Sequence, residues 1–172
     1  MGQYWKPVIL EKDKKTVVKW VYSHSYKSGL KLMEHSWIEN NFVKAFETLI
    51  TNNPQHVVWG GDYAEPEKKG GDNTYTRCTE KNEVKPFVPT TTGRFVVNHT
   101  KKLYVDKTKS PNKDGWQIHP LPLLTCCGNG RGGGDYRGND TKGLIGSWAR
   151  DLISIETEKP TGFNELKFNL TE

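Results

Sequence analysis

Apolar residues near the start of the chain recur with a period of two, which is typical of β-strands. Residues 16–22 show this period clearly, because Val18, Trp20 and Tyr22 share one face of an extended chain. Residues 4–10 predict a preceding antiparallel strand, which Pro7 places at an edge or an early position. Further strands are expected at 57–59, 94–98, 103–105, 152–155 and 166–170, with a proline-bearing edge segment at 116–125.

The period changes to three and four residues over 30–50, which predicts the one clear helix. The positions that carry this pattern are Leu30, Met33, Trp37, Ile38, Phe42, Ala45, Phe46 and Leu49. Asn40-Asn41 weakens the middle, so a kink or two helices are expected, and Asn52-Asn53-Pro54 ends the helix. No repeat or linker is visible. The pattern therefore predicts a single domain over 1–172 with an α+β fold, in which one main helix packs against a mostly antiparallel sheet.

The composition supports a small soluble protein with an aromatic core. Only 34% of the 172 residues are apolar, but they include six Trp, seven Tyr and six Phe. No apolar run reaches the roughly 18 residues that a membrane span needs, and no signal peptide is evident, so a cytoplasmic location without membrane contact is expected. Cys78, Cys126 and Cys127 are expected to be free thiols, because their number is odd and two are adjacent. The net charge of +5 weakly favours polyanionic partners, although a solvated surface explains it better.

Residues 127–138 hold six glycines and form the strongest candidate for a functional site. Glycine loses much conformational entropy on folding, so such a loop indicates close approach of the backbone to a ligand. Successive N–H groups can bind an anion, and arginines can contact phosphate. A flexible surface loop or a strained turn explains the same composition equally well. The predicted ligand-binding residues are Asn129, Arg131, Gly132, Gly133, Gly134 and Asp135, with Asp62, Trp148 and Asp151.

Motifs for known cofactors are absent or weak, so no cofactor and no metal ion is predicted. The loop matches GxGxxG literally, but no βαβ unit surrounds it, and no Walker Lys-Ser/Thr follows. The adjoining arginine Arg137 adds to the phosphate-binding signal, and Asp135 is suited to a ribose hydroxyl or a metal ion.

Two histidines and two carboxylates are the remaining candidates for chemistry. His99 and His119 are candidate general bases if their segments share one cleft; alternatively, each is hydrogen-bonded within a turn. Asp62 and Asp151 could act as metal ligands or in acid–base chemistry. The simpler interpretation is that Asp62 caps a turn and Asp151 pairs with Arg150 or a lysine.

Five segments together resemble a group of small, uncharacterised bacterial and phage or prophage proteins that open with Met-Gly-Gln-Tyr. The segments are Met1-Gly2-Gln3-Tyr4-Trp5, Gly29-Leu30-Lys31-Leu32-Met33-Glu34, Gly61-Asp62-Tyr63-Ala64-Glu65, Gly130-Arg131-Gly132-Gly133-Gly134-Asp135 and Ile145-Gly146-Ser147-Trp148-Ala149-Arg150-Asp151. The resemblance covers most of the chain and brings no established activity. It implies an accessory role such as interference with host defence, and a site at which Asp62, Asp135 and Asp151 meet in space.

Three hypotheses for the function follow. The first is a binding module that holds an anionic small molecule or nucleotide in the glycine-rich loop and sequesters a host defence signal. The second is a phosphoester hydrolase or nuclease, with His99 or His119 as the base and the aspartates as metal ligands. The third is an inhibitor that binds a host protein through exposed aromatic side chains.

Overall fold

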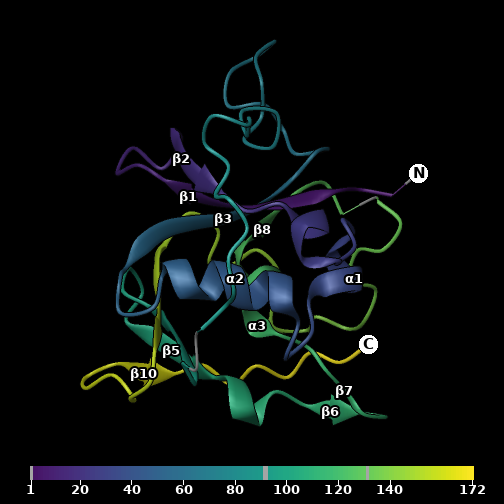
Figure 1. Ribbon diagram of the computed structural model, residues 1–172. Coiled ribbons are helices and arrows are strands. Elements are labelled where there is room, and N and C mark those ends of the chain that lie inside the picture. Colours follow the sequence, from purple (N-terminus) through teal and green to yellow (C-terminus); the bar gives the residue numbers. More distant parts are fainter. Residues whose placement is uncertain (1, 91–92, 131) are drawn as a thin grey trace.

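The structure is a computed structural model that describes residues 2–90, 93–130 and 132–172 (Figure 1). It confirms an α+β fold built around a mostly antiparallel sheet. The strands are β1 (Trp5–Leu10), β2 (Val17–Trp20), β3 (Gln55–Gly61), β4 (Phe95–Asn98), β5 (Leu103–Asp106), β6 (Asn112–Lys113), β7 (Trp116–Gln117), β8 (Cys126–Cys127), β9 (Leu152–Glu156) and β10 (Asn164–Glu165). The helices are α1 (Leu32–His35), α2 (Asn41–Leu49) and α3 (Pro120–Thr125), with 3-10 turns η1 (Ser23–Tyr26) and η2 (Lys107–Lys109).

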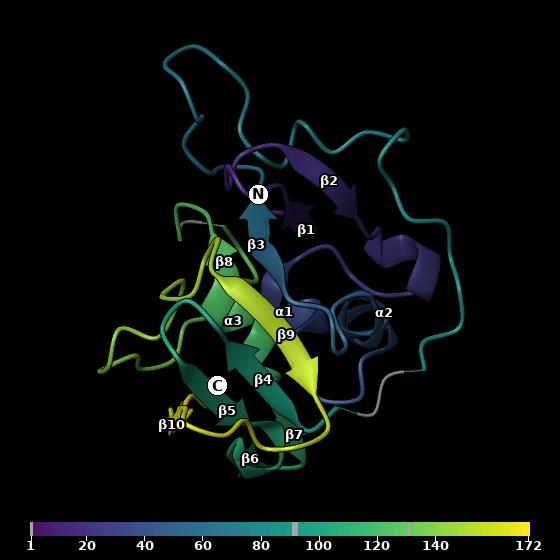
Figure 2. The same cartoon turned by 90° about the vertical axis from the view of Figure 1, so that its left-hand side faces the viewer.

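Within the described residues, eight strands form one sheet and β6 pairs with β7 as a separate hairpin. The order across the large sheet is β10-β5-β4-β9-β3-β1-β2, and β8 pairs with β3 beside this path. All of its pairs are antiparallel except β10 with β5 and β8 with β3. The sheet curves around the three helices, which lie together on one of its faces (Figures 1 and 2).

Both faces of the β1–β3 region are covered, which explains why these strands are almost uniformly apolar. Ile9 and Trp59 belong to the core beneath the helices, whereas Val8 and Val58 belong to a second cluster on the opposite face. The polar segment between β3 and β4 covers this second face and projects at the top of Figure 1. Trp20 holds this segment against the sheet, because its indole Nε1 donates to the carbonyl of Thr79 over 2.7 Å. This segment is therefore a cover for the sheet.

The region predicted as a helix over 30–50 forms two separate helices, which is one of the two outcomes that the sequence predicts. Asn40 causes the division, because its side-chain Oδ1 accepts hydrogen bonds from the backbone N–H groups of Phe42 and Val43. An asparagine that satisfies the first free N–H groups of a helix starts a new helix. Only α2 presents a long apolar face, and its Phe42 and Phe46 are fully buried. It is the main helix of the fold.

The prediction of an extended edge at 116–125 is wrong for its second half, which forms α3. Pro120 and Pro122 do not prevent this helix, because both lie in its first turn, where the backbone N–H groups have no partner within the helix. The predicted strand at 166–170 is also absent, since pairing with β5 ends at Glu165. Phe168 and Leu170 nevertheless bury their side chains in the core.

The core is aromatic, as the composition predicts. Trp59 lies at its centre, with its ring centroid 5.3 Å from that of Phe46 and 5.9 Å from that of Phe42. Trp148 is also fully buried. In the described part of the chain, no helix has the length and apolar character needed to cross a membrane.

His35 links α1 to the central strand through a buried hydrogen-bonded chain. Its Nε2 accepts from the indole Nε1 of Trp59 over 2.9 Å, and its Nδ1 lies 3.0 Å from the carbonyl oxygen of Gly29. Both contacts are satisfied by a neutral ring that carries its proton on Nδ1. Burial lowers the pKa of His35 to about 4, so the neutral form persists in the folded protein well into the acid range.

We predict that His35 makes the protein acid-labile. The unfolded chain binds a proton at His35 near the usual pKa of 6.5, whereas the folded chain binds it only near pH 4. The free energy of unfolding should therefore fall as the pH falls through this window, by at most about 1.4 kcal/mol per pH unit from this residue. Urea unfolding between pH 7 and pH 4 measures this slope.

His35→Gln is the matched variant, because its amide can donate to Gly29 and accept from Trp59 without titrating. Its stability should depend less on pH than that of the wild type. Equal slopes for the two proteins would contradict the assignment.

Candidate functional site

The glycine-rich loop is attached to the N-terminal strand through the carboxylate of Asp135. Gln3 Nε2 donates to Asp135 Oδ2 over 2.9 Å, and the indole Nε1 of Trp5 donates to Oδ1 over 3.1 Å. The backbone N–H of Gly132 adds a third bond over 3.1 Å. Burial raises the pKa of Asp135 above its usual value, although these three hydrogen bonds act in the opposite direction. The loop thus uses its own acidic side chain as the anion that its backbone holds.

Close packing against the same strand explains several of the glycines. A Cβ atom at Gly128 would collide with the side chains of Gln3 and Trp5, and one at Gly132 would collide with the backbone of Gln3. Gly134 has φ of +83°, and its carbonyl accepts from the N–H of Met33 over 2.8 Å. The predicted close approach of the loop backbone therefore exists, but the partner at these three positions is the chain itself.

A cavity of about 320 Å³ opens beside this junction. Its lining includes Trp5, Cys127, Gly130, Asp135, Tyr136 and Ala149. Such a volume lies at the lower end of the range for small-molecule sites, which are mostly apolar with a few polar groups that orient the ligand. Asp135 is the acidic side chain in this lining, so any ligand here meets one carboxylate set among aromatic, apolar and glycine surfaces.

The rest of the predicted loop residues take different positions. Asn129 forms hydrogen bonds of 3.3 Å with Gln3 in both directions. Gln3 Nε2 donates to Asn129 Oδ1, and the backbone N–H of Asn129 donates to Gln3 Oε1. Gly133 forms an isolated bridge with Gly2. Arg131 lies outside the described residues. Arg137 is exposed and makes no ion pair with any other described residue.

The three aspartates expected to meet are divided between two places. Asp62 is close enough for its charge to raise the pKa of Asp135, and its Oδ1 accepts from the N–H of Tyr4 over 2.9 Å. Asp151 lies just before β9, where it accepts from Asn98 Nδ2 over 2.8 Å and pairs with Lys101. Among the residues that the structure describes, no three His, Cys, Asp or Glu side chains are grouped to hold a metal ion. The expectation of one shared carboxylate site is wrong.

Trp148 is only 1% exposed and belongs to the core, so it is not a ligand-binding residue of the cavity. Its neighbour Ala149 reaches the cavity lining. The tryptophan motif therefore lies beside the cavity, but the residues of the motif that line it are Ile145, Gly146 and Ala149 and not Trp148.

His119 is held in a structural role at the start of α3. Its Nδ1 accepts from the N–H of Leu121 over 3.1 Å, and its Nε2 lies 3.0 Å from Oε1 of the buried Glu47. Burial lowers the pKa of His119 despite the nearby carboxylate. Lys107 pairs with the same Glu47, so the imidazole belongs to a buried charged cluster.

His99 lies elsewhere, against β9 and the C-terminal segment. Its Nε2 is 2.7 Å from the hydroxyl oxygen of Ser154, and its ring packs edge-on against Phe163. The expectation that both histidines reach one cleft is wrong, because the segment carrying His119 forms α3 and not a strand beside β4.

Cys126 and Cys127 form β8, and all three cysteines are free. Burial raises the pKa of Cys126 to about 12, which keeps it as a thiol at neutral pH. Cys127 is half-buried and lines the cavity.

Sequence reasoning missed the residues that the N-terminal segment contributes. Gln3 and Trp5 hold Asp135, yet they lie more than 120 positions before the loop. Both fall within the Met-Gly-Gln-Tyr-Trp opening on which the resemblance partly rests, so that motif carried the signal. Tyr136 also lines the cavity, and its place directly after Asp135 is the sequence signal that could have identified it.

Comparisons with known protein families, with curated proteins and with solved structures give no match to this chain.

We predict that two adjacent glycines of the loop differ sharply in their tolerance of alanine. Gly132→Ala places a methyl group against the backbone of Gln3, and such overpacking typically costs about 1–3 kcal/mol. Gly133→Ala meets only the Cα of Gly2 at 3.7 Å, an ordinary contact, so it should change stability by less than about 1 kcal/mol. Thermal and urea unfolding of both variants measure the difference.

Equal destabilisation by the two alanines would show that the loop does not pack on the N-terminal strand in this way.

Proposed function

We propose that this protein binds a nucleotide or a similar phosphorylated small molecule in the cavity beside Asp135. The observation that carries the proposal is the carboxylate of Asp135, which is fixed by Gln3 and Trp5 at the wall of an otherwise apolar, aromatic and glycine-lined cavity. A rigid polar group in an apolar cavity is the usual arrangement for orienting a small ligand.

The carboxylate retains capacity for a ligand. A carboxylate offers about four lone-pair positions, and Gln3, Trp5 and Gly132 occupy three of them. A ribose hydroxyl or the exocyclic amine of a base is a suitable fourth donor. Tyr136 is half-buried and supplies aromatic surface beside it, which suits the flat face of a base.

The phosphate of such a ligand requires positive charge away from Asp135. The stem of Lys31 lies along Gly2 and Gly134, and Arg137 follows the loop on its exposed side. Neither side chain forms an ion pair in the described part of the chain. These two side chains therefore favour an anionic end on the ligand.

Binding is better supported than hydrolysis, because His99 and His119 both have protein partners and lie outside the lining of this cavity. The resemblance to phage and prophage proteins supports an accessory role for such binding. A protein that holds a signalling nucleotide without consuming it would sequester a host defence signal.

We predict that a side chain at Gly130 blocks this site. Gly130 lines the cavity with φ of +65° and open space around its Cα, so Gly130→Asn adds a group there in a conformation that asparagine tolerates. Gly143 has the same φ of +65° and the same open surroundings outside the cavity, which makes Gly143→Asn the matched control. Gly130→Asn should weaken binding by about tenfold or more, and Gly143→Asn by less than about twofold.

Thermal shift and calorimetry with ribonucleotides and cyclic nucleotides measure binding, and protection of Cys127 from a thiol reagent reports its position. The recovered ligand is then checked by chromatography with and without Mg²⁺. Absence of a stabilising nucleotide, or equal effects of the two asparagines, would contradict the proposal. Conversion of the ligand would contradict binding without turnover.

A further inference from the structure

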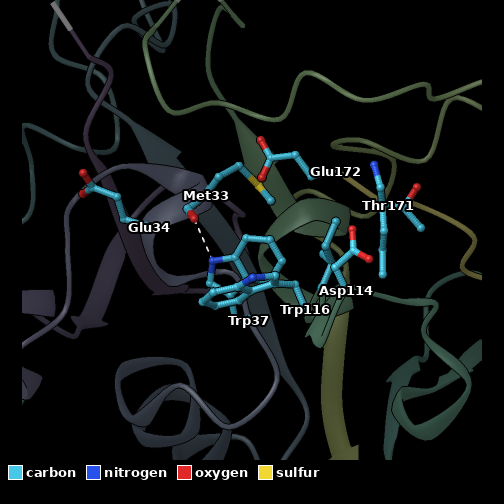
Figure 3. A pocket seen from close by; sticks show the side chains of 9 residues that line it. Met33, Glu34, Trp37, Asp114, Trp116, Thr171 and Glu172 are labelled. Carbon is cyan, nitrogen blue, oxygen red and sulfur yellow. Dashed lines mark hydrogen bonds between the residues drawn. The ribbon is translucent and has the colours of Figure 1, made fainter.

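A second cavity, of about 490 Å³, lies between α1, the β6–β7 hairpin and the C-terminal segment (Figure 3). It shares no lining residue with the cavity beside Asp135 in the described chain. Its inner wall is formed by Met33, Trp37 and Ile118, and its outer wall by Trp116.

The two tryptophans form a fixed aromatic wall. The indole Nε1 of Trp37 donates to the carbonyl of Met33 over 2.7 Å, which satisfies its polar atom and fixes its ring (Figure 3). Trp116 packs against it with centroids 5.1 Å apart and an angle of 58° between the ring planes. Trp116 is still 61% exposed, so one large aromatic face remains in contact with solvent.

The backbone holds Trp116 in this exposed position. Asp114 and Gly115 both have positive φ, +54° and +84°, as the type I′ turn of a tight hairpin requires. Asn112 Oδ1 accepts from the N–H of Gly115 over 3.0 Å. On the other side, the carbonyl of Gln117 accepts from the N–H of Ile38 over 2.9 Å. The exposure of Trp116 is therefore a property of an ordered hairpin.

Three of the four described charged residues that line this cavity are acidic, although the chain as a whole has a net positive charge. Asp114 lies beside Trp116, and the side chain of Glu172 lies near Met33 (Figure 3). Neither carboxylate forms an ion pair with another described residue. Glu34 also lines the cavity, but it points away and accepts from the N–H of Lys31. On a chain with net charge +5, an aromatic face between two unpaired carboxylates selects for a cation.

We propose that this pocket binds an arginine side chain of a partner polypeptide. A guanidinium group is planar and weakly hydrated, so it can lie flat on the exposed face of Trp116 while its N–H groups donate to Asp114 and Glu172. A lysine ammonium is a compact, strongly hydrated charge and uses the flat face less well. The positive charge of Lys113 at the rim repels the guanidinium group and lowers its affinity for the pocket.

The test is an NMR titration of the whole chain with acetyl-Gly-Arg-Gly-amide and with the same peptide carrying lysine or citrulline. Arginine should give saturable shifts at the indole N–H signals of Trp37 and Trp116. Lysine should bind roughly threefold or more weakly, and citrulline, which has a similar shape without charge, should show no saturation. Equal binding of citrulline and arginine, or no saturable shift with arginine, would overturn the proposal.

Variants separate charge from packing. Asp114→Asn removes one charge while keeping a residue that favours the left-handed turn, and it should weaken arginine binding about three- to tenfold. Trp116→Ala should abolish saturable binding, whereas Tyr63→Ala removes an exposed aromatic far from this lining and should leave it unchanged. Lys113→Gln should strengthen binding. Opposite responses at Asp114 and Lys113 are required; the same response at both would overturn the assignment of a cationic ligand.

Discussion

One buried carboxylate fixes the position of the glycine-rich loop. Asp135 is 6% exposed and could not remain there as a charged group without donors. Two of its donors, Gln3 and Trp5, come from the other end of the chain, and the third is the N–H of Gly132. Because Trp5 begins β1, and β1 pairs with β3 along its whole length, the loop is attached to the sheet through the strand next to its edge strand β2. The cavity beside Asp135 exists only while this attachment holds.

The short helix α1 separates the two cavities. Leu32 lines the cavity beside Asp135, whereas its neighbour Met33 lines the tryptophan pocket. The N–H of Met33 also donates to Gly134 in the loop. This short helix thus contributes to the linings of two cavities of different composition: within the described chain, Asp135 is the charged residue of the first lining, whereas Glu34, Lys113, Asp114 and Glu172 line the second.

The buried histidines hold elements together, which shows why a histidine in a sequence is weak evidence for catalysis. His35 spans from Gly29 to Trp59 across the core, and His119 caps α3 while lying next to Glu47. In both cases the ring nitrogens are used by the fold, and burial lowers the pKa. Imidazole serves here as a compact group that can donate with one nitrogen and accept with the other.

The sequence by itself determined the α+β class, the first hairpin and the helical region around α2 with its break at Asn40, and it nominated residues 128–138 as the candidate site. These features depend on local periodicity and on single residues that stop or start an element. Tertiary structure alone decided that 120–125 is helical, that Asp151 lies apart from Asp135, and that Gln3 and Trp5 complete the loop. Such features depend on contacts between residues far apart in the chain, and no local pattern specifies which distant donor will satisfy a buried carboxylate.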